Sequence, residues 1–188
     1  MQRILMLLTM LLVTMAGLGQ QTVPPPPRPV ANGPSLEVTM KFIQDKLNAV
    51  GSLDYSISFH DTATGNNWVN HFIDEVTKVV ADPGTCRVTF HERLVVDDKV
   101  RFDGDDNLAL KDIQNVMVLP LEQDLKQHGE HPAWERKVNQ PLWSLWLERP
   151  NHNIISLYFR DAETANRVAN AVNHAVELCG GKMQAEPF

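Results

Sequence analysis

The chain has few basic residues for its length. Among its 188 residues there are 17 lysines and arginines but 23 aspartates and glutamates, which gives a formal net charge of −6. Nucleic-acid binding needs clustered lysine and arginine to neutralise phosphates and release counterions. Attachment to anionic lipid headgroups needs a similar basic surface. We therefore expect neither nucleic acid nor, after export, a membrane among the partners.

The sequence also lacks the short motifs that accompany common catalytic sites. It contains no G-x-S-x-G, H-E-x-x-H or G-x-G-x-x-G pattern. The run Gly180-Gly181-Lys182 follows a helical segment instead of preceding one, so a phosphate there would meet the negative end of the helix dipole. Acidic residues fall mainly in expected turns and on helix surfaces, away from one another. We assign no catalytic residue and no cofactor.

The apolar run near the amino terminus is short for a membrane span. It covers residues 4–18, about fifteen residues, whereas a spanning helix needs roughly twenty. Arg3 precedes it and small residues follow it, which is typical of a secretory signal over residues 1–19. No cysteine lies near the cleavage point, so a lipoprotein signal is not supported. The segment predicts a secreted or periplasmic protein; an uncleaved anchor and a buried helix are the alternatives.

A proline-rich stretch, "QTVPPPPRPVANGPS", follows the signal segment. Consecutive prolines favour a stiff, extended polyproline II conformation. Residues 20–34 therefore predict a spacer, with a ligand for a proline-reading domain as the alternative. One globular domain is expected over residues 35–181, long enough for a single core, and residues 182–188 are expected to form a disordered tail.

The domain opens and closes with predicted helices. In "SLEVTMKFIQDKLNAVG", Ser35 is a suitable N-cap and the apolar residues repeat at steps of three and four, which makes the helix amphipathic. The last helix, from the N-cap Asp161 to Gly180, carries valines and alanines along one side and can approach a sheet closely.

Between these helices the hydrophobic pattern indicates strands. Apolar and polar residues alternate over residues 53–61, 67–81 and 86–96, the second run with a bulge. "FDGDDN" is expected to be a turn, residues 108–120 to form one or two short strands, and residues 122–140 to be a polar loop. Residues 141–150 and 153–161 predict a hairpin. The fold class is α+β, with six or seven antiparallel strands.

Three segments resemble a known fold. "LALKDIQNVMV", "WSLWLERPNHNIISLYF" and "DAETANRVANAVNHAVELCGG" are similar to the back half of a pleckstrin-homology-like (PH-like) domain, and the last segment resembles uncharacterised exported bacterial proteins that share this organisation. The resemblance implies a bent antiparallel sheet or barrel closed by a C-terminal helix. It implies no activity, because this scaffold serves many roles. Phosphoinositide binding is not expected, since the loop "DTATGNN" has no basic residue.

The two cysteines are both expected to point inward. Cys86 begins a strand and Cys179 lies on the apolar side of the last helix. In an oxidising compartment an even number of cysteines favours a bond, so we predict a Cys86–Cys179 disulfide; two buried thiols or a reactive thiol are the alternatives. His174 and Cys179 are five residues apart and point to different sides of the helix, which excludes a local nucleophile pair.

Two loops contain residue types that bind metal ions. "HGEHP" supplies His128 and His131, but a catalytic zinc site needs three protein ligands, and a third would have to come from His152 or Glu130. When "DGDDN" is aligned from Asp103 with a calcium-binding EF-hand loop, Leu108 stands at position six, where the loop needs glycine, and Gln114 stands at position twelve, where it needs glutamate. We predict a solvated loop and a hairpin turn, with a metal site at His128 and His131 as the weaker alternative.

Trp146 shares one strand face with Leu142 and Ser144, while Trp143 and Leu145 share the other. Both tryptophans can be buried only if something covers the second face. We expect the first helix to cover Trp146; the alternative is an exposed tryptophan that binds a partner.

No place in the sequence predicts that several ionisable groups converge. The residues therefore favour an exported, non-catalytic binding or structural module whose partner is an unknown protein or peptide. The alternative is an extracytoplasmic metal-dependent hydrolase that uses the loop with His128 and His131.

Overall fold

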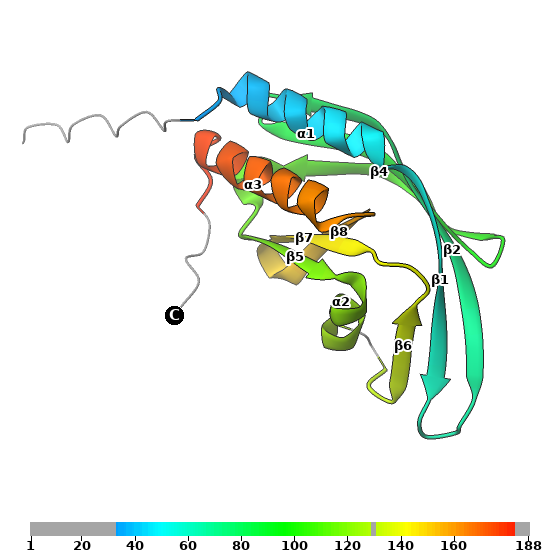
Figure 1. Ribbon diagram of the computed structural model, residues 1–188. Helices are drawn as coiled ribbons and strands as arrows, with labels where there is room; N and C mark the ends of the chain where they lie inside the picture. The colour runs from blue at the N-terminus through cyan, green and yellow to red at the C-terminus, as the bar shows by residue number, and fades with distance from the viewer. Residues whose placement is uncertain (1–32, 129–130, 183–188) are drawn as a thin grey trace, which may run out of the picture. The chain divides into compact units, whose positions relative to one another are not determined.

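The computed structural model describes residues 33–128 and 131–182, and in this part of the chain it contains three α-helices and two antiparallel sheets (Figure 1). The five-stranded sheet has the order β4-β3-β2-β1-β6 and the three-stranded sheet the order β5-β7-β8. The expected signal segment, most of the expected linker and residues 183–188 lie outside the described residues. The helices are α1 Leu36–Val50, α2 Leu121–His128 and α3 Ala162–Leu178, and the strands are β1 Gly51–Asp61, β2 Asn67–Asp82, β3 Arg87–Val96, β4 Lys99–Ala109, β5 Asn115–Pro120, β6 Trp134–Val138, β7 Trp143–Arg149 and β8 Asn153–Phe159.

The two long helices begin where the sequence predicts, because a side chain caps each one. Ser35 Oγ accepts a hydrogen bond from the Val38 backbone N–H, and Asp161 Oδ1 accepts one from the Thr164 N–H at 2.7 Å. Each cap satisfies a backbone donor that the helix itself leaves unpaired.

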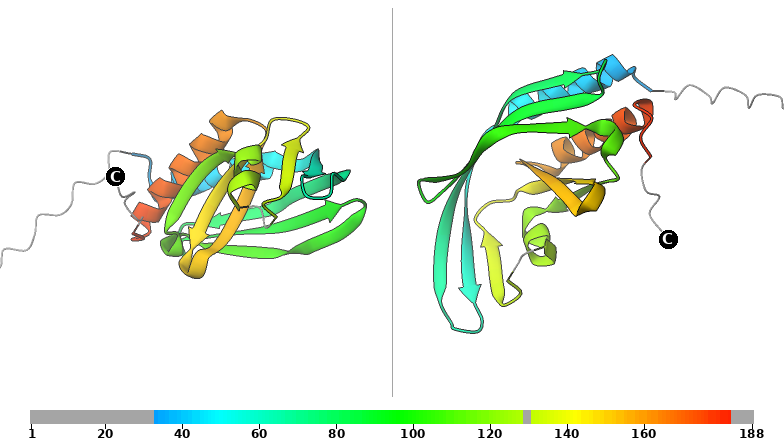
Figure 2. Two further views of the ribbon diagram at one scale, coloured as in Figure 1. Left: turned by 90° about the horizontal axis from the view of Figure 1, so that it is seen from below. Right: turned by 180° about the vertical axis from the view of Figure 1, so that it is seen from behind.

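The five-stranded sheet is long and strongly bent, and its concave side holds the other elements (Figures 1 and 2). Helices α1 and α3 lie side by side at one end, where α1 packs on β2 and α3 packs on the three-stranded sheet. The main core fills the space between these helices and both sheets. Its largest fully buried members include Met40, Ile43, Phe90, Leu108, Leu145, Leu147 and Phe159.

A second, smaller core lies farther along the bent sheet. Here α2 packs on the concave face of β1 and of its neighbour β6, and the buried residues are Leu53, Tyr55, Ile57, Leu121, Val138 and Leu142. Along β2, Asp74 lies between Phe72, which packs against the smaller core, and Val76 of the main core.

The architecture confirms the α+β class and the C-terminal helix but corrects the expected sheet. The described residues form eight strands where six or seven were expected, and they are divided between two sheets that do not close into a barrel. The division follows from Leu110–Asp112, a short 3₁₀ turn, after which the chain leaves the first sheet and begins the second. The resemblance to PH-like proteins stays a prediction.

The stretch "FDGDDN" is not a turn. It lies inside β4, where Asp103 pairs with Arg93 and Asp106 with Phe90. The hairpin turn is instead Asp97-Asp98, two residues that both adopt left-handed φ values, as a two-residue hairpin requires. The pair Asp103-Gly104 is the stronger turn signal in the sequence, so the predicted turn lies six residues after the observed one.

The expected polar loop of residues 122–140 is also wrong in part. It contains most of α2 and all of β6, which pairs antiparallel with the end of β1. Leu121 and Leu125, four residues apart, are the apolar positions that hold α2 against the sheet. Two such positions are too few to indicate a helix by periodicity.

Candidate ligand-binding cavity

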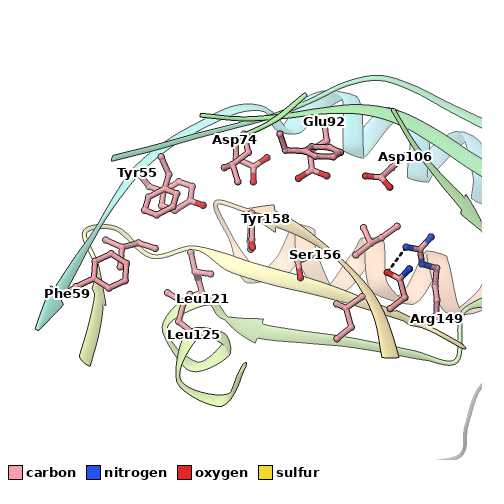
Figure 3. A pocket seen from close by; sticks show the side chains of 17 residues that line it. Tyr55, Phe59, Asp74, Glu92, Asp106, Leu121, Leu125, Arg149, Ser156 and Tyr158 are labelled. Atoms are coloured by element: carbon pink, nitrogen blue, oxygen red, sulfur yellow. Dashed lines mark hydrogen bonds between the residues drawn. The ribbon is translucent and has the colours of Figure 1, made fainter. Parts of the chain in front are cut away.

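A cavity of about 500 Å³ lies between the concave face of the five-stranded sheet and the three-stranded sheet (Figure 3). Its size is within the range of pockets that hold small ligands. Strands β1 to β4 form one wall, and β8 forms the opposite wall together with the end of β7, while α2 closes one side. The apolar lining residues are Ile57, Phe59, Phe72, Leu94, Phe102, Leu121, Leu125, Ile154 and Ile155.

Three carboxyl groups enter the cavity from neighbouring strands. Asp74 of β2, Glu92 of β3 and Asp106 of β4 point from the concave face of the larger sheet toward β8 (Figure 3). The register explains their common direction, because Glu92 pairs with Gly104, two residues before Asp106, and Asp74 pairs with Leu94. We call these three residues the acidic wall.

Asp74 is the most deeply buried member of the acidic wall. The residue is only 5% exposed, and within the described residues its carboxyl group forms no hydrogen bond and no ion pair. Burial, and secondarily the charge of Glu75, raise the pKa of Asp74 to about 6. A buried carboxylate without a partner is costly, so burial favours the neutral, protonated form of this group.

Glu92 is half-buried beside it. Burial raises the pKa of Glu92 to about 7, and the charges of Asp74 and Asp106 and a side-chain hydrogen bond with Asp106 act in the same direction. A hydrogen bond between two carboxyl groups requires a proton on one of them. The acidic wall therefore changes its charge between mildly acidic and neutral pH.

Aromatic rings lie next to the carboxyl groups. Tyr55 stacks on Phe72 with 5.2 Å between ring centroids, and the edge of Tyr158 on β8 meets Tyr55 at 6.4 Å. Burial raises the pKa of both phenols, so both stay neutral at physiological pH. Ring faces attract cations, which adds to the electrostatic preference of the acidic wall.

One basic residue lines the other end of the cavity. Arg149 Nη2 donates a hydrogen bond to Asn153 Oδ1 at 2.8 Å, and its Nε is buried without a partner in the described part of the chain. No ion pair joins Arg149 to the acidic wall among the described residues. The lining of the cavity therefore has one guanidinium group and three carboxyl groups.

The structure joins the two cysteines as the sequence predicts. Cys86, in the turn before β3, and Cys179, at the end of α3, form a disulfide with 5.9 Å between their Cα atoms. Neither cysteine lines the cavity. His174 donates a hydrogen bond from Nε2 to the Pro34 carbonyl oxygen. The last helix also contributes buried residues to the main core and Cys179 to the disulfide.

The histidines of the weaker metal alternative are not part of the cavity. His131 is exposed, and its ring lies 3.9 Å from that of Trp134; the His128 side chain and Glu130 lie outside the described residues. His152 bonds Glu148 at the β7–β8 turn. Among the residues that the structure describes, no three histidine, cysteine or acidic side chains are placed to hold a metal ion, and this includes the acidic wall.

Trp146 is buried, with 8% of its surface exposed, which confirms the prediction that its strand face is covered. It is therefore not the exposed partner-binding residue of the alternative. The cover, however, is not the first helix. Apolar residues of α1 pack in the main core with Leu145 and Leu147, which lie on the opposite face of β7.

Sequence reasoning missed the acidic wall, although one signal was present. On β3 the residues that point inward are Val88, Phe90, Glu92 and Leu94. Glu92 is therefore a charged residue at a position where the alternating pattern calls for an apolar one. On β2, Asp74 likewise lies between Phe72 and Val76 in the row of side chains that point inward. The expectation that no ionisable groups converge is wrong, because the pairing of three strands brings these carboxyl groups together.

Comparison of the chain with models of protein families, with curated proteins and with solved structures finds no significant match. None of the helices in the described ranges combines the length and the apolar character that a membrane crossing needs. The function therefore has to be inferred from the cavity.

Proposed function

We propose that the protein is an exported binding module, without catalytic activity, that recognises a cationic group attached to an apolar body. The cation, an ammonium or guanidinium group, binds between Asp74 and Glu92, and the apolar part contacts the rings of Tyr55 and Phe72. The observation that carries the proposal is the Asp74 carboxyl group, 5% exposed, directed into the cavity and without a partner in the described residues.

The electrostatics favour such a ligand. A carboxylate buried without a counter-charge loses hydration that nothing replaces, and the raised pKa values of Asp74 and Glu92 record that loss. A bound cation restores a favourable environment to the charged form. A neutral ligand of the same shape gains only the apolar contacts.

The composition of the lining supports a binding role in preference to catalysis. The residues that line the cavity include no histidine and no cysteine, so a serine such as Ser156 has no imidazole to activate it. All three carboxyl groups lie on one wall, whereas glycoside hydrolysis places two carboxyl groups on either side of the bond that breaks.

The disulfide supports the exported location. Disulfides persist in secreted and periplasmic proteins and are rare where cellular thiols keep cysteines reduced. The bond between Cys86 and Cys179 fits the first setting, in agreement with the signal pattern of residues 1–19.

Isothermal titration calorimetry tests the proposal with two small probes of similar shape, phenethylamine and the neutral phenethyl alcohol, at about pH 7.5 where the acidic wall is charged. We expect the amine to bind at least about tenfold more tightly, since hydrogen bonds to charged groups contribute roughly 1.5–3 kcal/mol. Asp74→Asn should remove this preference, and Glu92→Gln should weaken it.

The matched control is Glu135→Gln. Glu135 is an exposed carboxylate on the outer face of the same sheet, where it pairs with His60, and its removal should leave the affinity unchanged. Equal affinities for the amine and the alcohol, or an amine affinity that survives Asp74→Asn, would refute the proposed function.

A further inference from the structure

The cavity is bounded by the free edge of a β-strand. Strand β8 is the last strand of its sheet, and within residues 33–128 and 131–182 it pairs only with β7. Four consecutive residues of β8, from Asn153 to Ser156, line the cavity together with Tyr158. Successive side chains of a strand point to opposite faces, so a run of consecutive lining residues indicates that the backbone of β8, and not only one row of its side chains, borders the cavity.

The backbone at this edge lacks partners. In an antiparallel pair, alternate residues direct their N–H and C=O groups away from the neighbouring strand. Apart from its ladder with β7, the β8 backbone forms no backbone hydrogen bond within the described residues. An unpaired edge of this kind is a template for an added strand.

The rim of the cavity is apolar on both sides. Phe102 of β4, the edge strand of the larger sheet, is 43% exposed, and Ile154 of β8 is 36% exposed. The Phe102 ring lies over Gly104, where an added Cβ would come within 3.3 Å of it. Large apolar side chains on both edges suit a ligand that lies along the strands and brings apolar groups of its own.

We propose that the ligand is an extended peptide segment of a partner protein, which pairs with the edge of β8 and places a lysine or arginine side chain against the acidic wall. The inference rests on the proposed function, because it uses the same acidic cavity, and it adds the class of partner. Side chains of an added strand that share the face of Ser156 and Tyr158 point toward Asp74 and Glu92 (Figure 3). The charge of the acidic wall then selects a basic residue at that position.

The first test uses a synthetic peptide of about seven residues, long enough to follow β8. It alternates valine and threonine around a central lysine and has both ends blocked. We expect it to bind more tightly than phenethylamine, since its backbone adds hydrogen bonds that the amine cannot make. Replacing the lysine by norleucine, or Asp74 by Asn in the protein, should weaken binding about tenfold or more.

Backbone N-methylation separates strand pairing from recognition of side chains alone. Two versions of the peptide carry N-methyl groups on alternate backbone amides. In one version the methylated amides lie on the edge that faces β8, and in the other they lie on the opposite edge. Only methylation of the edge that faces β8 should weaken binding. One pattern should lower the affinity about tenfold or more and the other should leave it unchanged. Bound peptide should also slow hydrogen exchange of the β8 amides, measured by NMR on the full chain.

The outcomes distinguish the two proposals. If phenethylamine binds through Asp74 but the peptides bind no more tightly and both methylation patterns are harmless, strand pairing is refuted and the proposed function stands. If neither the amine nor the peptide binds, both proposals fail. A dimer of the free protein that Ile154→Asp dissociates, seen by sedimentation, would assign the edge to a second copy and refute the peptide.

Discussion

At the scale of the residue, Asp74 shows how position outweighs residue type. The same side chain on the outer face of β2 would be hydrated and ordinary, but on the inner face it loses water and gains no partner among the residues that the structure describes. The sequence gives one indication of this, because Asp74 is a charged residue at a position where the alternating pattern of the strand calls for an apolar one. It does not reveal that β4 brings Asp106 beside Glu92 and Asp74, because the register of β3 with β4 depends on a turn that the sequence pattern places incorrectly.

The burial of Asp74 predicts how stability changes with pH. Between the usual pKa of 3.8 and the folded value of about 6, the folded protein binds more protons than the unfolded chain, so its free energy of unfolding falls as pH rises through that range. Asp74→Asn removes this loss. Relative to wild type, the variant should gain up to about 3 kcal/mol between about pH 4 and about pH 7.5.

Urea unfolding at the two pH values measures this difference. Asp112→Asn, which changes an exposed carboxylate outside the cavity, is the control and should show no pH-dependent gain. If Asp74→Asn is instead less stable than wild type at neutral pH, the carboxylate has a stabilising partner in the free protein, and the reading of an unpaired buried acid is wrong.

At the scale of the element, the pattern of apolar residues predicted the long, capped or strongly alternating segments well. Helices α1 and α3, strands β1 to β3 and the β7–β8 hairpin all lie close to their expected positions. The misses are short or weakly patterned: α2 has two apolar anchors, and β6 is a five-residue edge strand that depends on β1 for its pairing. Such elements are stabilised by tertiary contacts and leave little signal in their own residues.

The Asp97-Asp98 turn gives a prediction at this scale. Asp98 has a φ of +61°, a conformation that glycine adopts without strain. Asp98→Gly should therefore raise the free energy of unfolding by about 0.5 kcal/mol, after the entropy of the unfolded glycine is counted. Asp97 stays, because its Oδ1 accepts a hydrogen bond from the His71 N–H.

Thermal or urea unfolding compares Asp98→Gly with Asp98→Ala, which keeps the strain but loses the short polar side chain. The alanine variant should be less stable than wild type and the glycine variant more stable. An alanine variant as stable as the glycine variant would mean that this turn does not adopt the left-handed conformation.

At the scale of the whole molecule, the cavity exists because two separate sheets face each other without closing. The main core and the smaller core hold them apart at two places, and the acidic wall lies between. Nothing local in the sequence predicts this spacing, since it depends on how the three-stranded sheet and α3 dock on the concave face. The disulfide was predictable, because inward positions of two cysteines could be read from their own elements.

The disulfide links residues 93 apart in sequence and fastens α3 to the start of β3. Removing it in the double variant Cys86→Ser/Cys179→Ser should lower the free energy of unfolding by about 2–4 kcal/mol, mainly by freeing the unfolded chain. Urea unfolding measures the loss. Mass spectrometry of the unreduced exported protein is the companion experiment, and two alkylatable thiols there would contradict the bond.

The most direct test of the cation-binding cavity is an NMR titration of the Asp74 side-chain carboxyl carbon, with and without phenethylamine. In the free protein the pKa should be about 6, and saturating amine should lower it, because the bound cation favours the carboxylate. A pKa near the ordinary 3.8 in the free protein, or one that the amine leaves unchanged, would contradict the proposal.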